Sequence, residues 1–207
     1  MPRMSAESCD ERKKAILAAC ASLYSTRNFK DISLKDISEL AKCTRTTIYN
    51  YFENKEEIFL GLLKCEYSSW IAELERILDS PIMPTKDTFA DALAHSLEKR
   101  TTLLKLLSIN LFEIEEHSRP EFLADFKSVY KQAREVLHEC MVVFFKDFSK
   151  EQQDDFVSLF FPFIIGIYPF CFVTEKQAAA MKIAKFNCPK YDLYDILRKA
   201  IRKLLGD

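Results

Sequence analysis

Residues 33–57 have the sequence SLKDISELAKCTRTTIYNYFENKEE, in which two short amphipathic helices flank a tight turn. Ser33, with Asp36 three residues later, has the spacing of a capping box, so a short helix is expected to begin here. Lys42-Cys43 leaves room for a turn only. Thr44 then has the character of an N-cap for a second short helix.

A longer helix follows directly. Asn54 is expected to cap it, and Glu57 again occupies the capping-box position. The apolar pattern continues from there to about Leu78. In the short helix before it, Ile48 and Phe52 are the inward side chains.

Two short helices joined by a tight turn form a helix-turn-helix, a motif that can place its second helix in the DNA major groove. Arg pairs with guanine, Thr meets thymine methyl groups or phosphates, and Asn pairs with adenine. No acidic residue lies between Lys42 and Phe52. The side chains expected to face outward from the second helix are of these DNA-reading types, or aromatic: Arg45, Thr46, Thr47, Tyr49 and Asn50.

Lys55 supports the same interpretation. It follows the predicted cap Asn54, where a cation opposes the helix dipole. A docked phosphate would compensate for this cost, because it would bind both the free N–H groups and the lysine. A solvated surface lysine is the alternative.

The sequence resembles the DNA-binding domain of TetR-type (AcrR-type) transcriptional regulators over about residues 10–60. The resemblance is carried by the stretch FKDISLKDISELA from Phe29 and by TRTTIYNYFENKEEIF from Thr44. It implies that Thr44 opens the recognition helix and that Arg45 reads bases. It also implies that Thr47, Tyr49 and Tyr51 contact the sugar-phosphate backbone and that Lys55 binds a phosphate.

Two positions depart from the family pattern. The turn usually has the sequence Ala-Gly-Val-Ser, and here it is Ala41-Lys42-Cys43-Thr44, which makes Lys42 a further candidate backbone contact. Asn28 stands where the family usually has Gly, and we expect it to adopt the left-handed conformation that ends a helix predicted over residues 7–24.

Composition narrows the possible fold classes, partners and cellular compartments. The chain has 207 residues with only 3 Gly and 7 Pro, too few for a turn-rich sheet protein, so an all-α fold is expected. The net charge of −1 indicates no partner by itself. The first residues are polar, which argues against a signal peptide and favours the cytoplasm. The apolar run over residues 159–173 contains two prolines and is shorter than a membrane span, so it predicts a kinked, buried helix.

The sequence gives little support for an enzyme, a metal site or a disulfide framework. The seven cysteines are dispersed and form no CxxC pair, as expected for small buried side chains in a reducing compartment. No phosphate-binding loop, nucleophile elbow or HExxH motif is present. We therefore expect no catalytic residues, no metal and no cofactor.

The rest of the chain predicts a helical bundle. Helical patterns cover residues 86–100, 102–116, 120–147, 151–173, 175–186 and 190–205. We accordingly assign residues 1–54 to a DNA-binding domain and residues 55–207 to an effector-binding and dimerisation domain, as the family resemblance implies.

Two apolar stripes near the C-terminus have helical spacing. Each stripe either belongs to the core or forms a two-fold interface in a four-helix bundle. A dimer would suit a helix-turn-helix, because two recognition helices could then meet two half-sites. The predicted interface residues are Phe156, Phe160, Phe163, Ile167, Tyr194, Leu197 and Ile201.

A pocket for a small, largely apolar effector is expected in the bundle. The same aromatic side chains also fit an ordinary core. The candidate lining residues are Trp70, Phe89, His95, Asn110, Phe112, His117, Phe126 and Tyr130.

The preferred interpretation is thus a dimeric, ligand-responsive DNA-binding regulator, most simply a repressor of a pseudo-palindromic operator. An effector would tilt the long helix 55–78 and change the separation of the recognition helices. The alternative is a helical dimerisation or protein-binding module whose helix-turn-helix no longer reads DNA. In a third possibility, Cys43 beside the DNA face acts as a thiol sensor.

Overall fold

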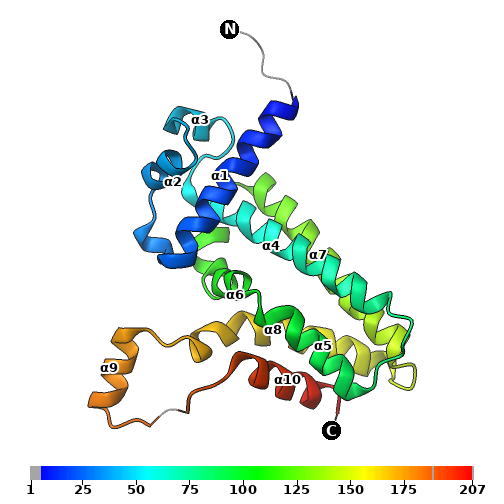
Figure 1. The fold of residues 1–207 in the computed structure, drawn as a ribbon. Helices are drawn as coiled ribbons and strands as arrows, with labels where there is room; N and C mark the ends of the chain where they lie inside the picture. The colour runs from blue at the N-terminus through cyan, green and yellow to red at the C-terminus, as the bar shows by residue number, and fades with distance from the viewer. Residues whose placement is uncertain (1–5, 188, 207) are drawn as a thin grey trace. The chain divides into compact units, whose positions relative to one another are not determined.

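The structure, a computed structural model, describes residues 6–187 and 189–206. Every regular element in this part is helical, which confirms the predicted class (Figure 1). The elements are α1 (Ala6–Thr26), a 3-10 turn η1 (Phe29–Asp31), α2 (Leu34–Leu40), α3 (Arg45–Tyr49), α4 (Lys55–Leu78), α5 (Lys86–Glu98), α6 (Thr101–Leu107), a π-helical segment η2 (Asn110–Glu115), α7 (Pro120–Phe144), α8 (Lys150–Cys171), α9 (Glu175–Ile183) and α10 (Leu193–Leu204).

The chain packs as two compact units. Unit 1 contains the chain up to Glu66 together with Ile109–Val129, and unit 2 contains Tyr67–Ser108 with the chain from Tyr130 onward. Both α4 and α7 therefore begin in unit 1 and continue into unit 2. The predicted functional boundary after residue 54 stays a prediction, since the packing boundary falls inside α4.

The helix starts follow the local capping chemistry. Ser33 and Asp36 form the predicted capping box, and Thr44 accepts a hydrogen bond from the backbone N–H of Thr47. Asn54 caps α4 by accepting from the N–H of Glu57 at 2.9 Å. The expectation for Asn28 was wrong: its φ of −89° is extended, and it precedes η1 instead of closing α1 in a left-handed turn.

Unit 1 is built around apolar side chains from each of its short helices. Ile37 of α2 and Ile48 of α3 are fully buried. Phe59 of α4 packs edge-on against Tyr24 and Phe29, with ring centroids 5.1 and 4.9 Å apart. Helix α2 packs on α1, and α3 packs on α2, so α3 is held by its buried side while its outer face stays in solvent.

Unit 2 has an aromatic core around Trp70. The Trp70 ring stacks on Phe160 and meets Phe161 edge-on, and its Nε1–H donates to the Ser96 hydroxyl at 3.0 Å. Around this centre α10 packs on α5 and α8, and α6 packs on α8. Trp70 and Ser96 are both buried, so the indole N–H has its partner inside the core.

Helix α8 is apolar on two faces. One face is buried in unit 2 through Phe156, Phe160 and Ile164, while Leu159 is 57% and Phe170 is 64% exposed. The predicted buried helix is thus only half correct, and both prolines lie inside one continuous helix. Among the described helices α8 has the length and composition of a membrane span, a property that core helices of globular proteins share, and 33% of its most apolar window is buried.

The turn between α2 and α3 contains a lysine in the left-handed region. Lys42 has φ 51°, and its neighbour Cys43 donates its backbone N–H to the Ser38 carbonyl at 3.0 Å. This backbone conformation costs a residue with a Cβ about 1–2 kcal/mol. The loss of the glycine usual in this turn therefore leaves the turn geometry intact but strained.

We expect Lys42→Gly to raise the free energy of unfolding by about 1 kcal/mol, because glycine adopts positive φ without steric cost. Urea denaturation followed by circular dichroism measures this difference. Lys35→Gly, the same chemical change inside α2, should lower the free energy of unfolding by about 1 kcal/mol. Equal effects of the two substitutions would contradict the assignment of strain to Lys42.

Candidate nucleic-acid interface

Helix α3 presents one polar face to solvent. Ile48 is buried beneath the helix, while Arg45, Thr46, Tyr49 and Asn50 are exposed. These four positions have the spacing i, i+1, i+4 and i+5, which places them on one side of a helix. The predicted reading residues are therefore brought together, and their side chains point away from the core.

The hydroxyl groups of Thr44 and Thr47 are already engaged with each other. Their oxygens lie 2.9 Å apart, and Thr44 also accepts the backbone N–H of Thr47 at 3.1 Å. Thr44 thus opens the helix, as expected. Both hydroxyls retain capacity for an additional hydrogen bond, because each has one donor and two acceptor lone pairs.

The two cations at this face have no internal counter-charge. Neither Lys42 nor Arg45 forms an ion pair with any residue that the structure describes, and both are exposed. No acidic side chain belongs to the stretch between Lys42 and Phe52. An anionic partner can therefore reach both cations without displacing a neighbouring carboxylate. Tyr51, the remaining predicted contact, is half-buried.

The structure gives Lys55 an internal role that differs from the predicted phosphate contact. Its ammonium group donates to the backbone carbonyls of Phe29 and Ile32 at 3.0 and 3.2 Å. It also lies 4.1 Å from the centroid of the Phe29 ring. Two carbonyls and an aromatic face thus offset the unfavourable position of a cation at the start of α4, and no phosphate is needed for that purpose.

A buried carboxylate lies one turn further along α4. Glu57 is 0% exposed, and its two oxygens accept from Arg119 Nε at 2.6 Å and Arg119 Nη2 at 2.8 Å. The backbone N–H groups of Glu53 and Arg119 also donate to it, at 2.7 and 3.3 Å. Burial raises the pKa of Glu57, but these hydrogen bonds outweigh burial and hold the pKa below its usual value. The carboxylate is therefore ionised at neutral pH.

Further polar contacts join the same segments of unit 1. The Asn54 amide donates to the His117 carbonyl at 2.8 Å, and Lys30 lies 3.1 Å from Glu113. Sequence reasoning missed the Glu57–Arg119 pair and assigned Glu57 only a capping role. No local sequence pattern indicates this pair, because the two residues are 62 positions apart in the chain.

The predicted effector residues are divided between the two units. Trp70 and Phe89 lie in the closed core of unit 2, and His95 is exposed and stacked on Tyr194. In unit 1, Phe112 is 84% exposed. Aromatic spacing along separate helices did not reveal which side chains face one cavity. The rest of the set divides as follows: Asn110 and Phe126 are buried in unit 1, His117 is exposed there, and Tyr130 lines a groove of unit 2.

Most of the predicted interface stripe is also core. Within one chain Phe156, Phe160, Ile167, Leu197 and Ile201 are buried, so a second copy cannot reach them. Helical spacing identified an apolar face correctly, but this face packs in the core of the chain and not against a second copy. The two remaining side chains, Phe163 and Tyr194, are half-buried, and the Tyr194 hydroxyl donates to Asp91.

Comparisons with known proteins identify both parts of the chain. The family model for tetR-family bacterial regulatory proteins matches residues 16–62, and that for the tetracyclin repressor-like C-terminal domain matches residues 64–206. The HTH-type transcriptional regulator EthR of Mycolicibacterium smegmatis is 39% identical over 61 residues, which are 30% of this chain and 28% of EthR.

The matches that cover more of the chain have lower sequence identity. The uncharacterized HTH-type regulator YhgD of Bacillus subtilis is 28% identical over 130 residues, which are 61% of this chain and 64% of YhgD. These curated relatives are thus matched over less than two thirds of their length. The fatty acid degradation regulator FadR from Bacillus halodurans shares the fold, with a TM-score of 0.62, 17% identity, and 99% and 97% of the two chains covered.

Lys55→Met should lower the free energy of unfolding by about 1 kcal/mol, because the carbonyls of Phe29 and Ile32 lose a charged donor. Thermal or urea unfolding measures the change. Lys35→Met, at an exposed position of α2, is the matched control and should have little effect. Unchanged stability, combined with a salt dependence of DNA binding reduced by about one ion, would instead assign Lys55 to a phosphate.

Glu57→Ala should cost about 2–3 kcal/mol of stability, because the Arg119 guanidinium and two backbone N–H groups lose their shared acceptor. A double-mutant cycle with Arg119→Met should give a coupling free energy well above zero. Glu116→Ala, which removes an exposed carboxylate of the same segment, serves as the control. Additive effects of the two substitutions would show that the pair does not join α4 to residue 119.

Proposed function

Because this chain belongs to the TetR family of bacterial regulatory proteins, we propose that it is a transcriptional repressor that binds a pseudo-palindromic operator as a homodimer and is released by a small, largely apolar effector. The observation that carries the proposal is the outer face of α3. Arg45, Thr46, Tyr49 and Asn50 are exposed on it, and no carboxylate neutralises its cations. Such a face is suited to the major groove.

The exposed face of α8 supports the homodimer. Leu159 and Phe170 are large apolar side chains in contact with solvent, and Pro162, Gly166 and Pro169 lie exposed between them. An apolar face of this extent on a globular protein indicates an interaction surface. Two copies paired through α8 would carry two recognition helices, as a palindromic operator requires.

The path of the chain supports the effector response. Helices α4 and α7 each continue from unit 1 into unit 2, and the Glu57–Arg119 pair joins their beginnings in unit 1. A change in unit 2 that moves either helix would therefore act on the unit that carries α3. We place the effector in unit 2 and the protein in the cytoplasm, where its operator is available.

The alternative of a helical module that no longer reads DNA has less support. Such a module has no reason to keep Arg45 and Lys42 exposed without counter-charges next to an intact turn. Cys43, the candidate for a thiol switch, is half-buried in the turn between α2 and α3. The buried thiols Cys20 and Cys140 act as small apolar side chains, and burial raises the pKa of Cys140 to about 12.

Arg45→Ala should weaken operator binding by about 10- to 100-fold while leaving binding to unrelated DNA nearly unchanged, because a bidentate contact to guanine carries sequence information. The operator is first selected from the DNA upstream of the gene, and fluorescence anisotropy at two salt concentrations then gives the affinities. Arg76→Ala, which removes an exposed arginine of α4 in unit 2, is the matched control.

Two results would contradict the proposal. In the first, genomic selection recovers no preferred sequence. In the second, Arg45→Ala and Arg76→Ala have equal effects on operator binding, which would leave the face of α3 without a role. Release of the wild-type complex by candidate apolar compounds tests the effector response separately, on the same labelled operator.

A further inference from the structure

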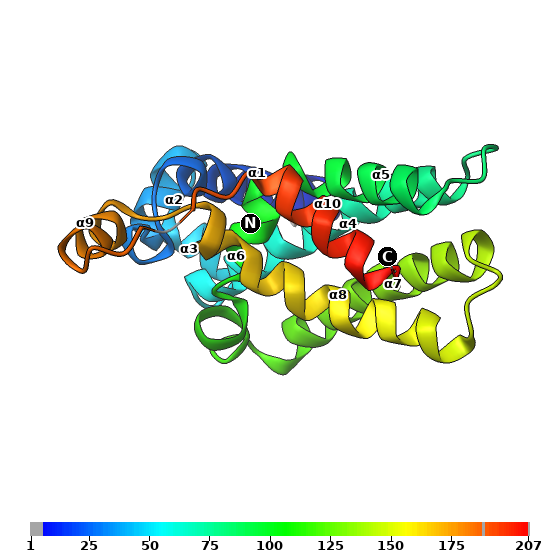
Figure 2. The ribbon, with the colours of Figure 1, turned by 90° about the horizontal axis from the view of Figure 1, so that it is seen from below.

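A segment of unit 2 is largely exposed to solvent. We call residues 172–187 and 189–191 the arm; it contains α9, which buries no side chain at all. In both views α9 lies beyond the ends of α8 and α10 (Figures 1 and 2). Large apolar side chains of the arm are in solvent, among them Ile183 at 85% and Phe186 at 58% exposure.

Helix α9 needs to pack on another surface to be stable. An isolated helix shorter than about 12–15 residues is marginal in water, and α9 has 9. Its start is nevertheless well specified, since Thr174 and Gln177 form a complete capping box. A capped helix with exposed Ile183 and Phe186 has the character of an element that is completed by a partner.

The arm is also basic. It contains Lys176, Lys182, Lys185 and Lys190 but only one acid, Glu175. None of these four lysines forms an ion pair with a residue that the structure describes. The surface that receives the arm is therefore expected to combine apolar area with unpaired carboxylates.

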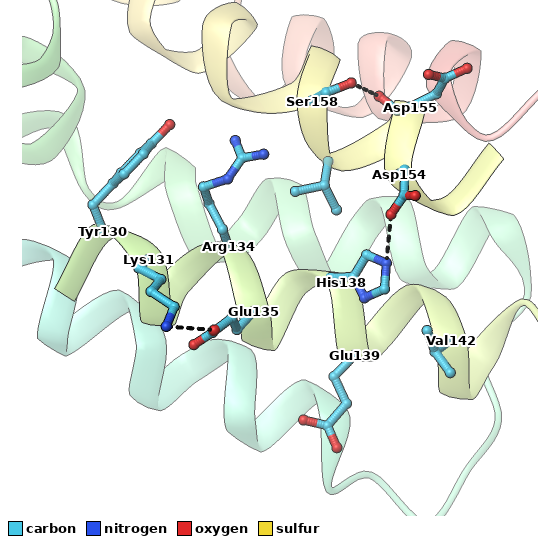
Figure 3. Close-up of a pocket in the computed structure, with 11 residues that line it drawn as sticks. Tyr130, Lys131, Arg134, Glu135, His138, Glu139, Val142, Asp154, Asp155 and Ser158 are labelled. Atoms are coloured by element: carbon cyan, nitrogen blue, oxygen red, sulfur yellow. Dashed lines mark hydrogen bonds and ion pairs between the residues drawn. The ribbon is translucent and has the colours of Figure 1, made fainter. Parts of the chain in front are cut away.

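A groove between α7 and α8 has this composition (Figure 3). It measures 820 Å³ and includes the apolar side chains Val142 and Val157. Two of its carboxylates are paired, Asp154 with His138 and Glu135 with Lys131. Two others, Glu139 and Asp155, have no ion-pair partner among the described residues.

Pairing two copies of α8 brings the arm to this groove. Gly166 lies in the exposed face, and a Cβ built on it meets no atom within 4 Å, so another helix can approach closely there. Helix α8 ends at Cys171, and the arm continues beyond that end (Figures 1 and 2). If two copies of α8 cross antiparallel at Gly166, the arm of one copy is directed toward the N-terminal half of the other α8, where Asp155 and Ser158 line the groove.

We propose that the arm of one protomer docks in the α7–α8 groove of a second copy of this chain, so that the two protomers exchange arms. This inference rests on the proposed dimer and extends it. The apolar side chains of α9 cover the exposed Val142 of the partner groove, and Lys176 and Lys182 face Glu139 and Asp155 there.

Complementary charge reversals test the exchange. The arm variant Lys176→Glu/Lys182→Glu and the groove variant Glu139→Lys/Asp155→Lys should each weaken their own dimer by about tenfold or more at low salt, because like charges then meet at both contacts. A 1:1 mixture should restore wild-type affinity as a heterodimer, because both of its contacts pair opposite charges. Sedimentation gives the affinities, and native mass spectrometry with tags of different mass identifies the heterodimer.

Two controls distinguish a loss of docking from a loss of folding or a general effect of charge. Arg12→Glu/Lys35→Glu makes the same change in net charge as the arm variant, on exposed side chains of unit 1, and should leave the dimer affinity unchanged. Circular dichroism should show equal helix content in all variants, since the reversed side chains of the arm are exposed and form no ion pair with a described residue of their own chain.

Three outcomes would overturn the inference. If the wild-type protein sediments as a monomer, the proposed dimer and the arm exchange both fail. If the wild type dimerises and the variants match it within about twofold, the exchange alone fails. If each variant weakens the dimer but mixing restores nothing, the two sets of charges do not meet across the dimer, and the exchange fails. Operator binding by the wild type, measured in parallel, reports on the proposed function independently.

Discussion

The Glu57 carboxylate, which has no exposed surface, is the constraint on which unit 1 depends. A buried charge costs several kcal/mol unless it is fully hydrogen-bonded, and Glu57 is surrounded by four N–H donors from Glu53 and Arg119. The chain must therefore bring residue 119 to the beginning of α4. Because α7 begins at the next residue, Pro120, the two helices that continue into unit 2 start from one polar cluster.

Lys55 extends this cluster to a third segment. It ties the start of α4 to the carbonyls of Phe29 and Ile32, just before α2 begins. A lysine in this position is unfavourable for the helix dipole, so its retention needs a compensating contact, and the structure supplies one inside the protein. The same side chain still lies at the surface, half-buried, and its third N–H is available to a phosphate. Structural and DNA-binding roles can thus coexist in one residue.

Local chemistry predicted the helices well, because caps and turns are decided within a few residues. Ser33, Thr44 and Asn54 begin the helices that the spacing indicates. The contacts that join distant segments were not predictable in this way, and Arg119 reaches Glu57 across 62 positions. Helix α8 shows the same limit: its period revealed that Phe156 and Phe160 share a face, but both faces of the helix are apolar, and only packing decides which one is core.

The two apolar faces of α8 leave apolar surface outside the core of a single chain. The first face completes the Trp70 core, whereas the second, with the arm that follows it, leaves apolar area and unpaired lysines in water. A repressor of a two-fold operator needs its recognition helices at a fixed separation, because only that separation matches the groove spacing. In the proposed dimer, pairing through α8 alone would be a single crossing at Gly166, about which two protomers could pivot. Arms anchored on either side of the crossing would hold the angle between protomers, so the proposed arm exchange would supply the rigidity that operator recognition requires.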